Sequence, residues 1–225
     1  MRTTLLVDLD DTLYAYGPAE AAARAIVNEL VAKDLAATPS SIDEAFVRAR
    51  KAVKARIDGR GSSHSRLLYF HQMLHDLGRF DAMPRAREWD RAFWGALIAR
   101  AELRPGAVAL LEGWRRDRGK IAVVSDLTLE VQLWKLEAWG LADKIDALVV
   151  SEEVPADKPS PAMMELAFAR LGVHASDCVM IGDSDEKDGG AARAFDVPFH
   201  LVDTGAPPGR GKSLEAIGRE LGVFR

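Results

Sequence analysis

Short, uninterrupted apolar runs are the feature that most constrains how this chain can fold. They are rich in Val, Ile and Leu and lack clean alternation, so they predict strands that are covered on both faces. Helical stretches that end at a glycine separate the later runs. Strand and helix in alternation predict an α/β fold built on a parallel sheet. The predicted strands are Leu5–Asp8, Ile121–Ser125, Ala147–Ser151, Cys178–Gly182 and Pro198–Val202, and the predicted helices include Leu129–Trp139, Ala162–Leu171 and, at the end of the chain, Ser213–Leu221.

The segment from about Tyr16 to Leu103 differs because it contains no convincing strand. Pro, Gly and Ser mark its helix ends, and the Pro-Gly pair that closes Leu103–Gly106 breaks the last helix. We therefore expect a core domain of residues 1–15 and 103–225 and an inserted helical domain of residues 16–102. The expected helices of the insert run from Pro18 to about Asp34, from a capping box at Ser41–Glu44, from Ser65 to Leu77, and from Pro84 to about Ala101. A Gly- and Pro-rich stretch, Thr204–Lys212, is expected to be an exposed loop.

Charge and composition narrow the classes of partner. The formal net charge is −4, which gives no reason to expect nucleic acid or an anionic membrane as partner. Cys178 is the only cysteine, so no intrachain disulfide can form. No apolar run approaches the roughly 20 residues of a membrane-spanning helix. These features predict a cytoplasmic protein.

Three aspartates follow the first predicted strand directly: Asp8, Asp10 and Asp11. Ligands of open parallel sheets bind at the carboxyl ends of the strands. Closely spaced carboxylates repel one another unless a cation or a shared proton lies between them. Mg²⁺ prefers hard oxygen ligands and also binds phosphate, so a magnesium site is one interpretation. An acidic turn after a strand is the other.

Further polar groups stand at the ends of later strands. Ser125 and Asp126 end the second strand, where a hydroxyl and the next backbone amides can receive a phosphate oxygen. Lys158 lies beside two prolines, just before a helix, and offers a fixed positive charge. Asp183 follows Gly182, a residue that permits a tight turn, and Asp188 follows five residues later. Each group alone also fits a cap, a surface loop or an acidic helix start.

Taken together and in this order, the four groups resemble the four motifs of the haloacid dehalogenase-like superfamily. The resemblance covers residues 1–15 and 103–203, and the inserted helices resemble that superfamily's all-helical (C1-type) cap. It implies a Rossmann-like core with helices on both faces of its sheet. It also implies a Mg²⁺-dependent phosphatase that acts on a small phosphorylated metabolite through an aspartyl-phosphate intermediate. The family often has a glycine before the last core strand. Here Asp196 takes that place, and Asp tolerates the left-handed conformation better than most residues.

The resemblance also implies a role for each residue. Asp8 is the nucleophile, and Asp10 protonates the leaving oxygen and then activates water. The implied metal ligands are Asp8, Asp183 and the backbone carbonyl of Asp10, with Asp188 supporting that shell or orienting Lys158. The implied phosphate-binding residues are Thr12, Ser125, Asp126 and Lys158.

Several alternatives stay open at this point. Haloacid dehalogenases generally lack the second aspartate, so Asp10 favours phosphoryl transfer. A phosphomutase of the β-phosphoglucomutase type keeps the same aspartates and also has a helical cap. A degenerate member that only binds a phosphorylated ligand is the alternative without catalysis, but it predicts the loss of a catalytic residue.

The substrate is expected to be chosen by the helical insert. His64, Arg66 and Tyr69 are the candidates for specificity, with Arg60 and His71 near them, although a solvated helix face is equally compatible with this spacing. The run Asp8–Tyr14 resembles pyrimidine 5′-nucleotidase relatives. The chain is expected to be a monomer or a homodimer.

Overall fold

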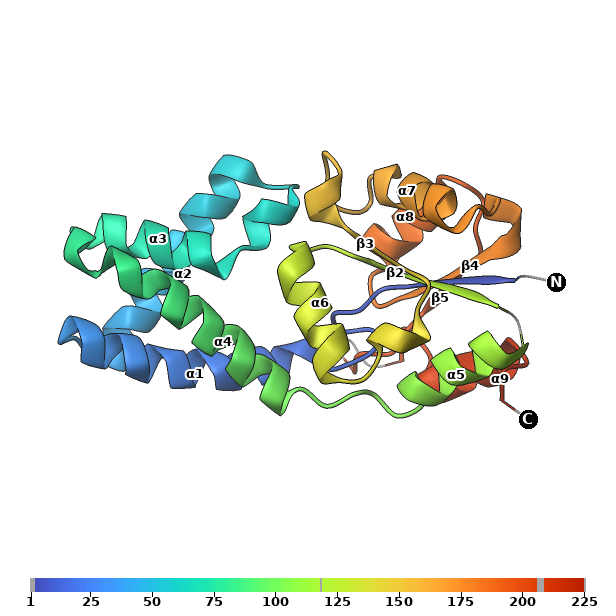
Figure 1. Cartoon of the computed structure of the whole chain (residues 1–225), viewed down its shortest axis with the longest axis horizontal. Helices are drawn as coiled ribbons and strands as arrows, with labels where there is room; N and C mark the ends of the chain where they lie inside the picture. The colour runs from blue at the N-terminus through green and yellow to red at the C-terminus, as the bar shows by residue number, and fades with distance from the viewer. Residues whose placement is uncertain (1–2, 118, 206–208, 225) are drawn as a thin grey trace. The chain divides into compact units, whose positions relative to one another are not determined.

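The chain divides into two units, one formed by Met1–Ala15 and Glu102–Arg225 and the other by Tyr16–Ala101. They are seen in a computed structural model that describes residues 3–117, 119–205 and 209–224 (Figure 1). Residues 206–208 of the predicted loop Thr204–Lys212 lie outside the described residues.

A parallel sheet forms the centre of the first unit. The strand order is β3-β2-β1-β4-β5, and every neighbouring pair is parallel. The α/β fold predicted from the apolar runs is therefore confirmed, and each predicted strand agrees with the structure to within one residue at either end. The strands are β1 (Thr4–Val7), β2 (Lys120–Ser125), β3 (Ala147–Val150), β4 (Cys178–Gly182) and β5 (Phe199–Leu201).

Helices cover both faces of this sheet, with α7 and α8 on one face and α5 and α9 on the other (Figure 1). Residues of β1, β2 and β4 pack against α7 and α8 in one buried cluster that includes Leu6, Val124, Met164 and Met180. Burial on both faces is the physical reason that the strands read as continuous apolar runs. The helices are α5 (Ala107–Asp117), α6 (Leu129–Ala138), α7 (Ala162–Leu171), α8 (Gly190–Arg193) and α9 (Leu214–Glu220), and a π-helical turn (Asp185–Gly189) precedes α8.

Local signals account for most ends of these helices. Gly172 ends α7 in the left-handed conformation, with φ of 61°. Asp196 has φ of 53°, which confirms that it takes the conformation expected of a glycine there. Helix α5 is absent from the sequence-based expectations. Its buried residues Ala107, Leu110, Leu111 and Trp114 recur at helical spacing, so the signal was present.

The regular secondary structure of the second unit consists only of helices. Helix α1 packs against α2 and α4, and α2 packs against α3. Its interior is aromatic: Phe46 contacts Tyr69, Phe70 and Phe93, with ring centroids 5.1 to 6.4 Å apart. The helices are α1 (Tyr16–Leu35), α2 (Pro39–Ile57), α3 (Arg66–Asp76) and α4 (Ala86–Arg100), with short 3₁₀ turns at Gly61–His64 and Phe80–Arg85.

Three expected helix starts in this unit differ from the structure, the first because α1 begins at Tyr16 and not at Pro18. The capping residue of α2 is Thr38, whose hydroxyl accepts a hydrogen bond from the Ser41 amide, so Ser41 lies inside the first turn. Pro39 at the first helical position explains the earlier start, since its fixed φ suits that place. Pro84 lies in the 3₁₀ turn before α4 and does not open the helix. Ser65, where the third helix was expected to begin, is the capping residue of α3.

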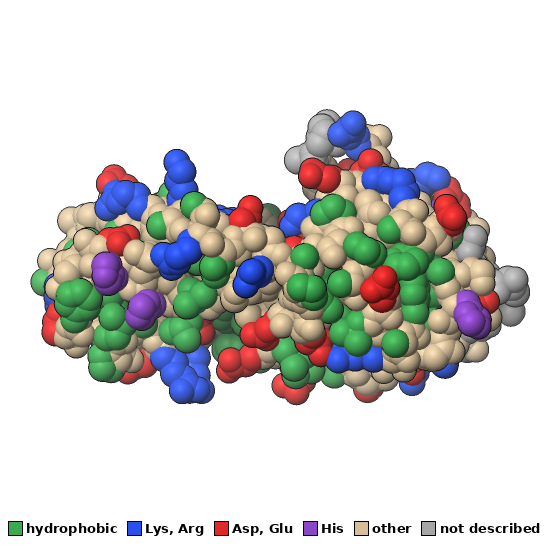
Figure 2. Space-filling view, turned by 90° about the horizontal axis from the view of Figure 1, so that it is seen from above, with side chains coloured by type: hydrophobic (Ala, Val, Ile, Leu, Met, Phe, Trp, Pro, Cys, Tyr) green, Lys and Arg blue, Asp and Glu red, His purple; other side chains and the backbone are tan. Residues whose placement is uncertain are grey.

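One face of the surface carries both signs of charge (Figure 2). On the face drawn in Figure 2, basic and acidic side chains are interspersed, as a net charge of −4 leads one to expect. Within the part of the chain that the structure describes, no helix is both long enough and apolar enough to span a bilayer.

Candidate active site

The carboxyl edge of the sheet brings the predicted site residues of the first unit together. Asp8 follows β1, Ser125 ends β2 and Asp183 follows β4. Strand β1 lies between β2 and β4, and all three are parallel, so their carboxyl ends meet at the same edge. Such an edge is where open α/β sheets bind their ligands.

Asp8 is an enclosed carboxylate of this edge, with only 4% of its surface exposed. One oxygen, Oδ1, accepts a hydrogen bond from the Lys158 ammonium at 2.6 Å, and the other, Oδ2, accepts one from the Thr12 hydroxyl at 3.0 Å. Burial raises the pKa of Asp8 well above its ordinary value, and the neighbouring carboxylates Asp188 and Asp183 raise it further, although Lys158 opposes them. The site therefore needs more positive charge than Lys158 supplies.

Lys158 is buried between two carboxylates. Its ammonium donates to Asp8 and to Asp188, each at 2.6 Å, and to the Val124 carbonyl at 3.0 Å. Burial alone would lower the pKa of Lys158, but Asp188 and Asp8 hold that pKa well above its ordinary value, so the lysine stays charged. A charged lysine held by three acceptors places a fixed positive charge beside Asp8, and a phosphate oxygen would have to replace one of these acceptors to bind it.

Asp188 is the second carboxylate that holds this lysine. Besides Lys158 it accepts the Ser184 backbone N–H at 3.0 Å. Gly182 makes room for it, because a Cβ on Gly182 would lie 2.4 Å from the Asp188 Cγ. The sequence had suggested that Gly182 permits a tight turn. The structure shows another reason for a glycine at this position, which is the close approach of the Asp188 side chain.

Asp8, Asp183 and Asp188 form a group whose carboxylate oxygens lie within 4.8 Å of one another. Burial and then the charge of Asp188 raise the pKa of Asp183 to about 6. Carboxylates that crowd in this way gain from a bound cation, and hard oxygen ligands suit Mg²⁺. The residues present thus fit the metal that the family resemblance implies. The Asp10 carboxylate does not belong to this group among the described residues.

Asp10 has an environment of its own. Its Oδ1 accepts hydrogen bonds from the Lys135 ammonium at 2.5 Å and from the Tyr14 hydroxyl, and its Oδ2 accepts one from the Gln132 amide at 2.8 Å. Burial alone would raise the pKa of Asp10, but Lys135, Tyr14 and Gln132 together bring that pKa below its ordinary value. Sequence reasoning missed all three partners, two of which come from α6.

The residues that end β2 have different surroundings. The Ser125 hydroxyl is buried and accepts a hydrogen bond from the Gln132 amide at 2.8 Å. The Asp126 carboxylate accepts the Lys158 backbone N–H at 2.9 Å and the Lys187 ammonium at 3.0 Å. Asp126 therefore ties the Lys158 segment to the end of β2. As an anion it can contribute only its backbone amide to a phosphate.

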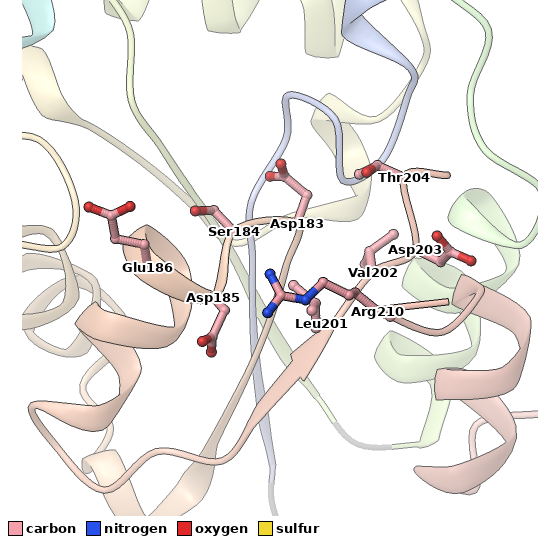
Figure 3. A pocket seen from close by; sticks show the side chains of 10 residues that line it. Asp183, Ser184, Asp185, Glu186, Leu201, Val202, Asp203, Thr204 and Arg210 are labelled. Carbon is pink, nitrogen blue, oxygen red and sulfur yellow. The ribbon is translucent and has the colours of Figure 1, made fainter. Parts of the chain in front are cut away.

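A cavity of about 350 Å³ opens beside Asp183. It is lined by residues 183–186 after β4, by residues 201–204 of β5 and the segment that follows it, and by Arg210 and Gly211. Figure 3 shows the Arg210 side chain reaching from its loop toward the segment that carries Asp183 and Asp185. Asp8 and Lys158 are not among its lining residues, so the cavity borders the carboxylate group on one side only.

The three specificity candidates lie in the helical unit and are not a solvated face. Arg66 is 6% exposed, Tyr69 is buried and His64 is half-buried. The Arg66 guanidinium donates to the His64 carbonyl at 2.7 Å and to the Tyr16 hydroxyl, and it lies 4.7 Å from the Trp94 ring centroid. The Tyr69 hydroxyl donates to the Ser63 carbonyl.

Comparison with known proteins decides the family. The family model described as haloacid dehalogenase-like hydrolase matches residues 3–196. The chain belongs to this family. This haloacid dehalogenase-like hydrolase is 36% identical over 206 residues to the ribulose-1,5-bisphosphate 5-phosphatase of Halopiger xanaduensis. The match covers 90% of this chain and 85% of the relative. The hydrolase is 30% identical over 197 residues to the glyceraldehyde 3-phosphate phosphatase of Methanopyrus kandleri. That match covers 86% of this chain and 81% of the relative.

Solved structures agree on the fold of this hydrolase. The 2-haloacid dehalogenase from Pseudomonas syringae pv. Tomato superposes with a TM-score of 0.80 at 22% identity, and the match covers the whole of both chains. At that identity the likeness concerns the fold alone. Both the Rossmann-like fold and the family resemblance predicted from the sequence are confirmed.

Proposed function

We propose that this hydrolase is a phosphatase that removes the phosphoryl group of a small phosphorylated metabolite through an aspartyl-phosphate on Asp8. The observation that carries the proposal is the buried Asp8 carboxylate, bonded to Lys158 and Thr12, with the separate carboxylate of Asp10 two residues later. A carboxylate nucleophile needs no base to activate it, but the charge on the phosphoryl group has to be neutralised.

The chain's own residues suffice for the proton and bond changes of both steps. Lys158 and the Ser125 hydroxyl hold the phosphoryl oxygens, and Thr12 keeps Asp8 in place. An Asp8 oxygen attacks phosphorus, and the leaving oxygen takes a proton from Asp10 as its bond to phosphorus breaks. Lys135 favours the ionised form of Asp10 in the free site, so the mechanism requires Asp10 to hold that proton in the substrate complex. Water then attacks the aspartyl-phosphate and returns a proton to Asp10, which frees phosphate and restores Asp8.

The carboxylates of Asp8 and Asp183 and the backbone carbonyl of Asp10 would hold Mg²⁺. When bound, the ion supplies positive charge that offsets the charge of the phosphoryl oxygens. The crowding of Asp8, Asp183 and Asp188 around one lysine supports this assignment. Asp188 is engaged with Lys158 and with the Ser184 amide, so we assign it to anchoring that lysine.

The substrate class that we favour is a short-chain sugar phosphate. Two relatives that match more than four fifths of their own length are named for ribulose 1,5-bisphosphate and glyceraldehyde 3-phosphate. In this proposal the helical unit acts as the cap, and His64, Arg66 and Tyr69 contribute to selection. The cytoplasmic location and the monomeric or homodimeric state stay predictions.

Replacing Asp8 with Asn tests the nucleophile. An amide cannot form the acyl-phosphate, so release of inorganic phosphate should fall at least ~10³-fold. Asp11→Asn is the matched control. It makes the same chemical change at a neighbouring carboxylate outside the Asp8, Asp183 and Asp188 group, and Asn also tolerates the left-handed backbone found there, with φ of 60°. Near wild-type turnover of folded Asp8→Asn protein would overturn the mechanism.

The assay also separates the alternative functions. A panel of ribulose 1,5-bisphosphate, glyceraldehyde 3-phosphate, phosphoserine, phosphoglycolate and pyrimidine nucleotides should yield free phosphate from at least one sugar phosphate. Isomerised product without free phosphate would instead indicate a phosphomutase. Slow turnover on every ester would favour a protein that only binds phosphorylated ligands.

A further inference from the structure

Asp10 is held by side chains that the catalytic motifs do not include. Lys135 and Gln132, both on α6, contact opposite oxygens of its carboxylate at 2.5 and 2.8 Å, and the Tyr14 hydroxyl adds a third hydrogen bond. The Lys135 ammonium also lies 5.5 Å from the centre of the Tyr14 ring. The carboxylate therefore has both its position and its rotation set by these neighbours.

The buried side of α6 carries two polar residues beside apolar ones. It carries Val131, Gln132, Lys135 and Leu136, and Lys135 and Gln132 are both 0% exposed. A buried charge or amide is costly unless it is paired, and apolar residues of similar size would pack there without that cost. Both polar groups instead point to the residues of the proposed site.

Gln132 joins two parts of that site. Its amide nitrogen donates to Asp10 and also to the Ser125 hydroxyl, each at 2.8 Å. Its amide oxygen is buried and has no partner among the described residues. The contacts that the structure gives this amide are therefore those of its nitrogen, which links Asp10 to the end of β2.

We propose that Lys135 and Gln132 are positioning residues that act through Asp10, fixing its carboxylate for the transfer of a proton to the leaving oxygen and then from the attacking water. This inference rests on the proposed phosphatase function. In the first step, the Asp10 proton passes to the leaving oxygen as its bond to phosphorus breaks. In the second, a water proton passes to Asp10 as the water oxygen bonds to phosphorus and the bond from Asp8 breaks. Both transfers require the same carboxylate position.

The test compares substrates that differ in their need for Asp10. Lys135→Met and Gln132→Leu should lower kcat on a sugar phosphate by ~10² or more, the usual size of a general acid–base contribution, with KM changed less than about threefold. p-Nitrophenyl phosphate has a leaving group that needs no proton. Its initial burst of nitrophenolate should keep its rate, while the steady-state rate that follows should fall. Lys144→Met is the matched control, since Lys144 pairs with Glu112 at 3.0 Å, away from the site residues, and it should behave as wild type.

A double variant shows whether Lys135 acts through Asp10. The double variant Lys135→Met with Asp10→Asn should be no slower than Asp10→Asn alone. Once Asp10 cannot transfer a proton, the loss of Lys135 has no carboxylate left to misplace. Tyr14→Phe removes one hydrogen bond with little change of volume. Its burst rate should also stay unchanged, and its steady-state rate should fall by less than that of Lys135→Met. It thus tests the inference even if Lys135→Met does not fold.

Two outcomes would overturn the inference. Equal losses in the burst and in the steady state would mean that α6 only supports the fold of the site. Additive losses in the double variant would mean that Lys135 acts independently of Asp10. Failure of the proposed phosphatase function is recognised separately, because wild type and Asp8→Asn would then release phosphate equally slowly.

Discussion

Arg66 is an unusual residue of the helical unit, a buried cation surrounded by aromatic rings. Its guanidinium lies 4.7 Å from the Trp94 ring centroid and 5.3 Å from that of Phe93. Within the described residues no carboxylate forms an ion pair with it. A guanidinium with fixed geometry and no acidic partner is suited to an anionic group of a ligand, such as a second phosphate.

We predict that Arg66→Ala lowers kcat/KM on the preferred sugar phosphate by about tenfold or more, equivalent to ~1.4 kcal/mol. Hydrolysis of p-nitrophenyl phosphate, which has no second anionic group, should hardly change. Arg66→Lys should give an intermediate loss, since it keeps the charge but not the planar fork. Steady-state kinetics on both esters measure the effect.

The control for Arg66 is Arg48→Ala, at an exposed position of α2. Because Arg66 also packs against rings, its removal can destabilise the unit, so thermal midpoints are measured alongside. Equal losses on both esters would indicate a folding defect. No loss on either would place specificity elsewhere in the helical unit.

Helices α1 and α4 are joined by a part-buried polar contact at Asp34. Its Oδ2 accepts hydrogen bonds from the Trp89 indole N–H at 2.7 Å and from the Arg85 guanidinium at 2.8 Å. Trp89 is fully buried, and Asp34 is the partner of its N–H in the structure. The hydrogen bonds from Trp89 and Arg85 also hold the pKa of Asp34 below its ordinary value, although burial opposes them.

We predict that Asp34→Ala lowers the free energy of unfolding by about 2 kcal/mol, the usual penalty for an unsatisfied buried donor. A group with a lowered folded-state pKa stabilises above its unfolded pKa of 3.8 and loses this effect as the pH falls. The difference between variant and wild type should therefore shrink below about pH 4. Urea unfolding at pH 7 and pH 3.5 measures it. Asp81→Ala, at an exposed pair with Arg79, is the control and should change little. Equal stability of Asp34→Ala and wild type at pH 7 would contradict the prediction.

Metal binding should link the site to the stability of the whole molecule. The pKa of Asp183 in the folded chain is about 6, above the ordinary value of 3.8, through burial and then through Asp188 and Asp11. The folded state thus binds this proton more tightly than the unfolded state. Without metal, this group makes the protein less stable as the pH rises through that range. Mg²⁺ favours the ionised carboxylates and opposes this loss.

We predict that saturating Mg²⁺ raises the thermal midpoint at pH 7.5 by roughly 5–10 °C, from the ~2.7 kcal/mol expected at a hundredfold excess over Kd. The gain should fall as the pH drops through about 6, because protons then compete with the metal at Asp183. Thermal scans at several pH values, with Mg²⁺ or with chelator, measure it.

Asp183→Asn should remove most of the gain in thermal midpoint. Asp185→Asn is the control, because Asp185 is exposed and pairs with Arg193. A gain that is the same at pH 5 and pH 7.5, or absent at both, would remove Asp183 from the metal site. Chelation should also stop turnover, and Ca²⁺ should inhibit it because it tolerates looser coordination than Mg²⁺.

The helical unit shows where local sequence signals reach their limit. Its existence and its helices follow from the absence of strand patterns between Tyr16 and Leu103. The start of α2 was misplaced because Ser41 and Thr38 both suit a cap, and Pro39 decided between them. The burial of Arg66 was not predictable, because its rings come from α1, α3 and α4, which only folding brings together.

Lys135 and Gln132 illustrate a signal that was present but weak. They stand three residues apart on the helix face that also carries Val131 and Leu136. Polar residues on an otherwise apolar face indicate a buried partner, but the pattern does not say which one. The partner, Asp10, lies 125 residues from Lys135 along the chain.

The sequence by itself determined which chemical groups stand at the carboxyl edge of the sheet. Apolar runs and the residues that follow them are local features, and parallel neighbours bring their ends together. Only the tertiary structure decided which charges meet: Lys158 with Asp8 and Asp188, and Lys135 with Asp10. The physical reason is that the strength of each pair depends on distance and on burial, and for groups 150 or 125 residues apart, both are set by the packing of the whole unit.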